Sequence, residues 1–137
     1  MTRSDVGAQP AAHGIIVGHA DLPRALLGAA ASIVGDTEGI TVISNSDCSA
    51  AELLARLIQA VDDCGTDNVI VFVDMFGSSC STAGARLRRD RSGVAVICGV
   101  NLPMLIRFLS YRSKLPFDEL VKLMEETGQS AVKPVNG

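Results

Sequence analysis

Residues 14–24, GIIVGHADLPR, contain the end of one structural element and the start of the next. Ile15–Val17 is an uninterrupted aliphatic run, which is typical of a short strand covered on both faces. Asp21 can cap a helix that follows at once, and Pro23 is tolerated in its first turn. His19 stands between the two elements. It is either a packing residue at a strand end or a reactive group that the fold presents.

The same alternation of apolar strand and amphipathic helix continues along the chain. Strands are predicted at residues 15–17, 39–44, 68–74 and 93–100. Helices are predicted between Asp21 and Gly35, from Ser49 or Asp47 through Asp62, from the loop at residues 77–84 towards Arg89, from Pro103 to about Tyr111, and at residues 117–126, the last ended by Thr127-Gly128. This order predicts an α/β fold with a doubly wound, mainly parallel four-stranded sheet and helices on both faces.

Length and composition limit the class of protein. The chain has 137 residues, of which 47% are hydrophobic and 4% aromatic, so we expect a single domain over residues 14–137 with an aliphatic core. Residues 1–13 are expected to be a flexible tail, and His13 within it to have no role. The net charge of -3 argues against nucleic-acid binding, and no apolar run is long enough to cross a membrane.

The cysteines are widely spaced and form no Cys-x-x-Cys pair. This spacing fits neither a structural zinc site nor a disulfide scaffold, so free thiols in a reducing cytoplasm are expected. The four cysteines are Cys48, Cys64, Cys80 and Cys98.

Polar residues follow three of the predicted strands. His19 comes after Val17, Asp74 after Val73, and Asn101 after Val100. In parallel sheets, ligands bind beyond the carboxyl ends of the strands where the strand order switches, so these side chains are expected to share a site. A carboxylate bonded to one imidazole nitrogen fixes the tautomer and leaves the other nitrogen basic, which suits His19 as a base or nucleophile.

The loop after Asp74 could bind an anion. Gly77-Ser78-Ser79 leads into a helix and supplies hydroxyls and backbone N–H groups, and helix starts favour phosphoryl groups. The chain has no Walker loop and no dinucleotide fingerprint, so neither a cofactor nor a metal is expected to take part.

Three stretches, IIVGHADLPRALL (15–27), VFVDMFGSSCSTAG (71–84) and VICGVNLPML (96–105), resemble the mannose-family IIA component of the bacterial phosphoenolpyruvate:sugar phosphotransferase system (PTS). The resemblance spans residues 14–132. It implies a cytoplasmic phosphotransferase component for sugar transport, in which His19 accepts a phosphoryl group from the phosphocarrier HPr and passes it to a IIB component. Membrane contact is implied only indirectly, through a IIC/IID transporter.

The resemblance also assigns roles to other residues. It implies that Asp74 orients His19 and that Ser79, with Ser78 and Gly77, binds the phosphoryl group. Asn101 and Phe76 are expected near the site. A homodimer with an exchanged C-terminal edge strand is implied as well, and Pro134 would suit only an edge or the end of such a strand.

The chain departs from the family pattern around both motifs. Gly18 and Ala20 flank His19, where the family usually has Thr or Ser before the histidine and Gly after it. Cys80 and Thr82 stand where the family usually has Pro and Asn. One alternative is therefore a regulatory or degenerate IIA-like module without sugar transport.

A second alternative uses a cysteine. Cys80 and Arg86 form a Cys-x5-Arg pattern, which in some phosphatases cradles phosphate, and a helix start would lower the pKa of the thiol. This reading predicts Cys80-dependent hydrolysis of aryl phosphates.

Overall fold

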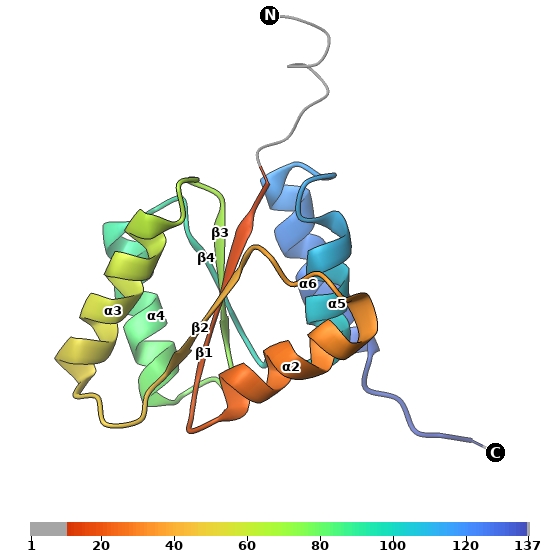
Figure 1. The fold of residues 1–137 in the computed structure, drawn as a ribbon, viewed down its shortest axis with the longest axis horizontal. Helices are drawn as coiled ribbons and strands as arrows, with labels where there is room; N and C mark the ends of the chain where they lie inside the picture. The colour runs from red at the N-terminus through yellow and green to blue at the C-terminus, as the bar shows by residue number, and fades with distance from the viewer. Residues whose placement is uncertain (1–10, 137) are drawn as a thin grey trace, which may run out of the picture.

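Strands and helices alternate along the whole described chain. The structure is a computed structural model and describes residues 11–136. Its elements, shown in Figure 1, are β1 (His13–Gly18), α2 (Leu22–Val34), β2 (Ile40–Ser44), α3 (Ala50–Asp63), β3 (Val69–Val73), α4 (Ser79–Asp90), β4 (Ala95–Cys98), α5 (Leu102–Tyr111) and α6 (Phe117–Ser130). The predicted α/β class with four strands is confirmed.

The four strands form one parallel sheet in the order β2-β1-β3-β4. β1 and β3 are the two inner strands, and the strand order reverses between them. Val17 of β1 is level with Val73 of β3, and Gly18 is level with Ser44 of β2. The register therefore brings the carboxyl ends of three strands to one edge of the sheet, at the switch point where ligands bind in such folds.

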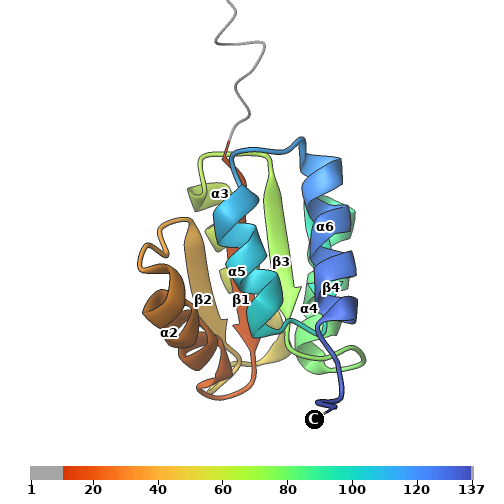
Figure 2. The same cartoon turned by 90° about the vertical axis from the view of Figure 1, so that its right-hand side faces the viewer.

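Helices cover both faces of the sheet. In Figure 1, α3 and α4 lie on one side and α2, α5 and α6 on the other, and Figure 2 shows this second group in front of the strands. Successive residues of β1 serve both cores, because Ile15 and Val17 pack with α3 and α4 while Ile16 packs with α5 and α6. Phe72 and Phe108 meet edge to face in the second core, with ring centroids 5.2 Å apart.

Within residues 11–136, α3, α4 and α5 begin with a side-chain cap, whereas α2 and α6 do not. Ser49 accepts a hydrogen bond from the backbone N–H of Glu52, and the Glu52 side chain accepts one from Ser49, which completes a capping box. Asp21 occupies the N-cap position of α2, but its side chain makes no capping bond, so that predicted role is wrong.

Three predicted boundaries are also wrong. Residues 79–84 of the predicted loop already belong to α4, because the Ser78 side chain caps the helix there. His13 is the first residue of β1 and does not precede it. α6 continues through Gly128 to Ser130, because Gly128 is buried and serves close helix packing instead of ending the helix. A Cβ at Gly128 would lie 2.3 Å from the Met104 Cε atom.

The strands and helices occupy residues 13–130 of the described chain. Residues 1–10 of the predicted tail lie outside the described residues, and residues 132–136 form neither helix nor strand in this single chain. Within residues 11–136, no helix has the length and apolar character needed to cross a bilayer.

Candidate functional site

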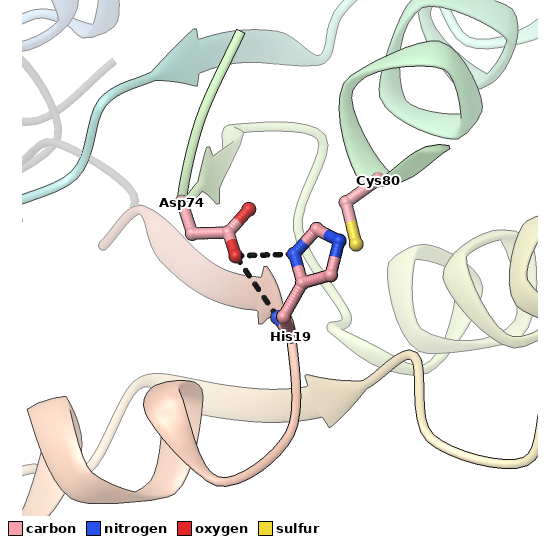
Figure 3. Close-up of side chains that lie close together, drawn as sticks. All are labelled: His19, Asp74 and Cys80. Carbon is pink, nitrogen blue, oxygen red and sulfur yellow. Dashed lines mark hydrogen bonds and ion pairs between the residues drawn. The ribbon is translucent and has the colours of Figure 1, made fainter. Parts of the chain in front are cut away.

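His19 and Asp74 meet at the carboxyl edge of the sheet. The His19 Nδ1 atom lies 2.6 Å from Asp74 Oδ2, and the His19 backbone N–H donates to the same oxygen at 2.9 Å (Figure 3). The other carboxylate oxygen accepts from the backbone N–H of Met75 at 2.9 Å. Because a carboxylate only accepts, Nδ1 is the protonated nitrogen when the ring is neutral, and Nε2 is then the nitrogen with the free lone pair.

The two side chains differ in exposure. That of Asp74 is 7% exposed, whereas that of His19 is 46% exposed. Burial raises the pKa of the Asp74 carboxyl. The hydrogen bonds and charge of His19, together with the Met75 N–H, lower the pKa by more than burial raises it, so the pKa lies below its ordinary value. The site therefore presents an accessible imidazole held by a fixed, ionised carboxylate.

The residues on either side of His19 explain how the pair fits. A Cβ at Gly18 would lie 3.1 Å from Asp74 Cγ and Oδ2, so the absence of a side chain lets the carboxylate approach the strand. Ala20 has a left-handed backbone with φ of 52°, which turns the chain from β1 into α2. An L-residue with a Cβ is strained in this conformation.

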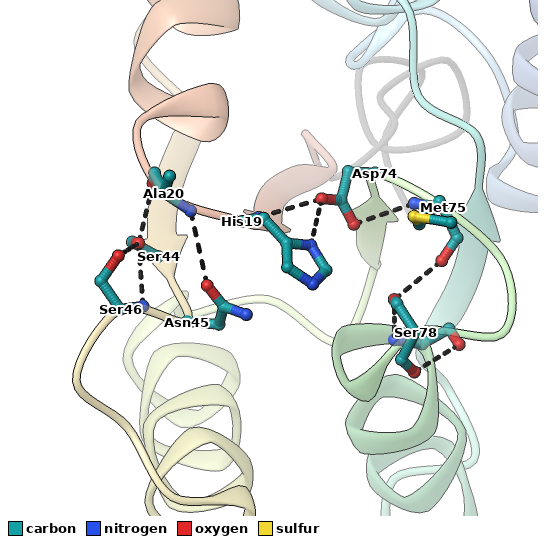
Figure 4. A network of polar contacts seen from close by, with 9 residues as sticks. His19, Ala20, Ser44, Asn45, Ser46, Asp74, Met75 and Ser78 are labelled. Carbon is teal, nitrogen blue, oxygen red and sulfur yellow. Dashed lines mark hydrogen bonds and ion pairs between the residues drawn. The ribbon is translucent and has the colours of Figure 1, made fainter.

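The loop after β2 supports this turn. The Asn45 Oδ1 atom accepts from the Ala20 N–H at 3.4 Å, and the Ser44 hydroxyl donates to the Ala20 carbonyl at 2.8 Å (Figure 4). Neither Ser44 nor Asn45 is among the predicted site residues. The strand-end rule would have found them had it also been applied to the predicted strand at residues 39–44.

The loop after β3 leads into α4 beside the histidine. Gly77 has φ of 84°, a conformation that favours glycine. The Ser78 hydroxyl is the helix cap, since it accepts from Ser81 N–H at 3.2 Å and donates to the Met75 carbonyl at 2.9 Å. Ser79 is the first residue of α4 and is exposed, and Phe76 is 85% exposed.

Asn101 has mainly structural contacts. Its Oδ1 atom caps α5 by accepting from Met104 N–H at 3.1 Å, and its Nδ2 donates to the Gly128 carbonyl at 3.0 Å. These bonds join α5 to α6, and neither of them reaches the His19–Asp74 pair.

Cys80 lies in the first turn of α4 and is fully buried. Its Sγ, a His19 ring nitrogen and an Asp74 oxygen all lie within 4.8 Å of one another. Burial, and then the charge of Asp74, raise the pKa of the thiol, contrary to the lowering expected for a phosphatase nucleophile.

The Cys-x5-Arg pattern is not a loop. Cys80 and Arg86 both lie within α4, and six residues of α-helix separate them by about 9 Å and about 240° of rotation. The two side chains therefore cannot cradle one phosphate, which removes the geometric basis of the phosphatase alternative.

Comparisons with known proteins agree on one family. Residues 14–125 match EIIA-man, the PTS system fructose IIA component family. The mannose-specific EIIAB component of Escherichia coli K12 is 36% identical over 125 residues, which is 87% of this chain but 38% of that protein. The fructose-specific EIIA component of Bacillus subtilis is 28% identical over 119 residues, or 85% of this chain and 82% of that one.

Solved structures agree with the fold. The mannose/sorbose-specific IIA subunit from Enterococcus faecalis superposes with a TM-score of 0.84 at 22% identity, covering 93% of this chain and 97% of that chain. The EIIA component from Streptococcus agalactiae gives a TM-score of 0.81 at 23% identity, covering 90% and 96%.

Proposed function

The chain belongs to the EIIA-man family of PTS fructose IIA components, and on that basis we propose that it is a phosphocarrier that holds a phosphoryl group on His19. The observation that carries the proposal is the His19–Asp74 pair, an accessible imidazole bonded through Nδ1 at 2.6 Å to a nearly buried carboxylate. This arrangement leaves Nε2 as the nucleophilic atom.

The transfer is a displacement at phosphorus. The Nε2 lone pair forms the new N–P bond while the bond to the donor nitrogen breaks, and the donor imidazole leaves with that electron pair. His19 keeps its Nδ1 proton and becomes positively charged, and the adjacent Asp74 carboxylate stabilises that charge. Positioning and electrostatics supply the catalysis, because the step needs no proton transfer to His19.

The start of α4 is suited to bind the transferred group. The exposed Ser79 hydroxyl and the first backbone N–H groups of the helix lie in the turn that also holds Cys80, next to the histidine. Gly77 and Ser78 shape the preceding loop, and Ser78 fixes the helix start through its cap. A helix N-terminus stabilises a negative group by about 0.3–1 kcal/mol.

The partners follow from the family. HPr is the proposed donor and a IIB component the proposed acceptor, and exposed Phe76 and Met75 offer an apolar contact beside His19. The chain spans 38% of the length of the E. coli relative, so these partners remain proposals for this protein. We also propose a cytoplasmic homodimer that reaches the membrane only through a IIC/IID transporter.

Intact-mass measurement tests the proposal. The protein is incubated with phosphoenolpyruvate, enzyme I and HPr from its own organism. We expect one acid-labile, base-stable phosphate on the wild type and on His13→Gln, and none on His19→Ala. A wild type that stays unmodified while HPr is phosphorylated would contradict the proposal and favour the degenerate binding module.

A further inference from the structure

Three side chains with metal-binding atoms converge at the carboxyl edge of the sheet. His19 follows β1, Asp74 follows β3, and Cys80 lies in the first turn of α4. One ligand atom from each lies within 4.8 Å of the others. Figure 3 shows the edge of the His19 ring that carries Nε2 turned toward the Cys80 sulfur, while Nδ1 faces Asp74.

We propose that His19 Nε2 and Cys80 Sγ bind a divalent cation of the zinc class, with Asp74 bonded to the far side of the imidazole. On binding, the Cys80 thiol releases its proton to solvent and the sulfur forms the metal bond. The thiolate and the carboxylate together balance the charge of the cation. Water completes the coordination on the exposed side of His19.

The Asp74 contact supports this arrangement. Metal-bound histidines usually donate their second N–H to a carboxylate or carbonyl, which fixes the tautomer and raises the basicity of the ligand nitrogen. Here the Nδ1 atom already lies 2.6 Å from a carboxylate that is itself fixed by backbone N–H groups.

The distances and access also fit. Zinc–ligand bonds of about 2.0–2.3 Å place tetrahedral ligands about 3.5 Å apart. The present ligand atoms lie within 4.8 Å of one another, so they need to approach by about 1.3 Å at most. The His19 side chain is 46% exposed and provides both the entry path and the freedom to adjust, while buried Cys80 is fixed. Imidazole with thiolate favours Zn²⁺ or Co²⁺ over Mg²⁺ or Ca²⁺.

Binding would compete with phosphorylation, because both use the Nε2 lone pair. This consequence rests on the proposed function, whereas metal binding itself does not. The cation is an inhibitor of the transfer and not a participant in it.

Metal titration of the purified full chain tests the site. With a phosphine reductant, Co²⁺ should bind at one equivalent and produce a thiolate-to-cobalt charge-transfer band, which Zn²⁺ then removes. Cys80→Ser and His19→Gln should each weaken binding at least tenfold. Cys64→Ser is the matched control, because its half-buried thiol lies at the C-terminus of α3, where it donates to the Ala60 carbonyl at 3.0 Å.

His19→Gln keeps the result interpretable if Cys80→Ser does not fold, since His19 is exposed and its replacement leaves the core intact. Equal binding by either variant and the wild type, or no binding at one equivalent by the wild type, overturns the proposal. Zinc should also block phosphorylation of the wild type, with at least tenfold more zinc needed for Cys80→Ser. If no phosphorylation occurs at all, the proposed function fails while the titration still decides the metal site.

Discussion

The two ends of β1 have almost mirrored sequences, His13-Gly14 at the start and Gly18-His19 just past the end. Each histidine bonds a polar side chain that belongs to, or directly follows, a neighbouring strand. The His13 Nε2 atom lies 2.8 Å from Thr41 Oγ1, and the His19 Nδ1 atom lies 2.6 Å from Asp74 Oδ2.

The partners make the two histidines chemically different. Burial, and then the charge of Arg112, lower the pKa of His13, so its neutral form is favoured beside a neutral hydroxyl. His19 instead bonds a carboxylate through Nδ1, and the start of α4 lies next to it. The two edges of the sheet therefore give the histidines different partners, a neutral hydroxyl for His13 and a carboxylate for His19.

Removing the partner of each histidine gives the largest expected difference in phosphorylation rate. Asp74→Asn removes the charge that stabilises the phosphorylated ring and allows the wrong tautomer, so the phosphorylation rate should fall about 100-fold or more. Thr41→Val removes the partner of His13 and should leave that rate unchanged, while stability falls by about 1 kcal/mol. Quenched time courses followed by intact mass measure both rates, and equal rates in the two variants would show that the carboxylate is dispensable.

The two glycines of β1 should separate stability from reactivity. A Cβ at Gly14 would lie 3.0 Å from the Phe108 ring and 3.1 Å from the Phe72 ring, so Gly14→Ala should cost about 1–3 kcal/mol of stability and leave the transfer rate unchanged. Gly18→Ala should displace Asp74 and slow phosphorylation about tenfold. Urea unfolding measures stability and the mass assay measures the transfer rate. A slower transfer in Gly14→Ala would contradict the prediction that this glycine affects stability alone.

The backbone of Ala20, next to His19, is expected to be strained. Its φ is 52°, so Ala20→Gly should relieve strain and stabilise the protein by about 1 kcal/mol. Ala55→Gly, in the exposed middle of α3, is the matched control and should destabilise by about 1 kcal/mol. If urea unfolding shows a loss of stability in both variants, the turn after β1 is not strained.

The sequence predicted what depends on local pattern. Aliphatic runs located all four strands, and the strand-end rule placed His19 and Asp74 together. It did not predict that Gly128 lies inside α6, because a glycine after a periodic segment usually ends a helix. In the structure, the Met104 Cε atom of α5 occupies the space where a Cβ of residue 128 would lie.

The rest of the site depends on three-dimensional register. Asn45 reaches Ala20 only because β2 pairs with β1, and Cys80 lies beside His19 only because α4 begins at the carboxyl edge. The position of Cys80 has no signal in the local sequence, whereas Asn45 directly follows a predicted strand and could have been found by the strand-end rule. Asn101 follows a strand, and the strand-end rule therefore predicted it near the site. Its amide instead bonds Met104 of α5 and Gly128 of α6.

The smallest expected difference concerns pH at the start of β1. Because the pKa of His13 lies below its ordinary 6.5 in the folded chain, the unfolded state binds more protons, and stability should decrease as pH falls from about 6.5 through the folded pKa. His13→Gln lacks this titration, so the stability difference between wild type and variant should shift against the wild type over that interval. Urea unfolding from about pH 8 to pH 5 measures it. A stability difference that stays constant with pH would mean that His13 has the same pKa in the folded and unfolded chain. The contrast between the two ends of β1 would then rest on Asp74 alone.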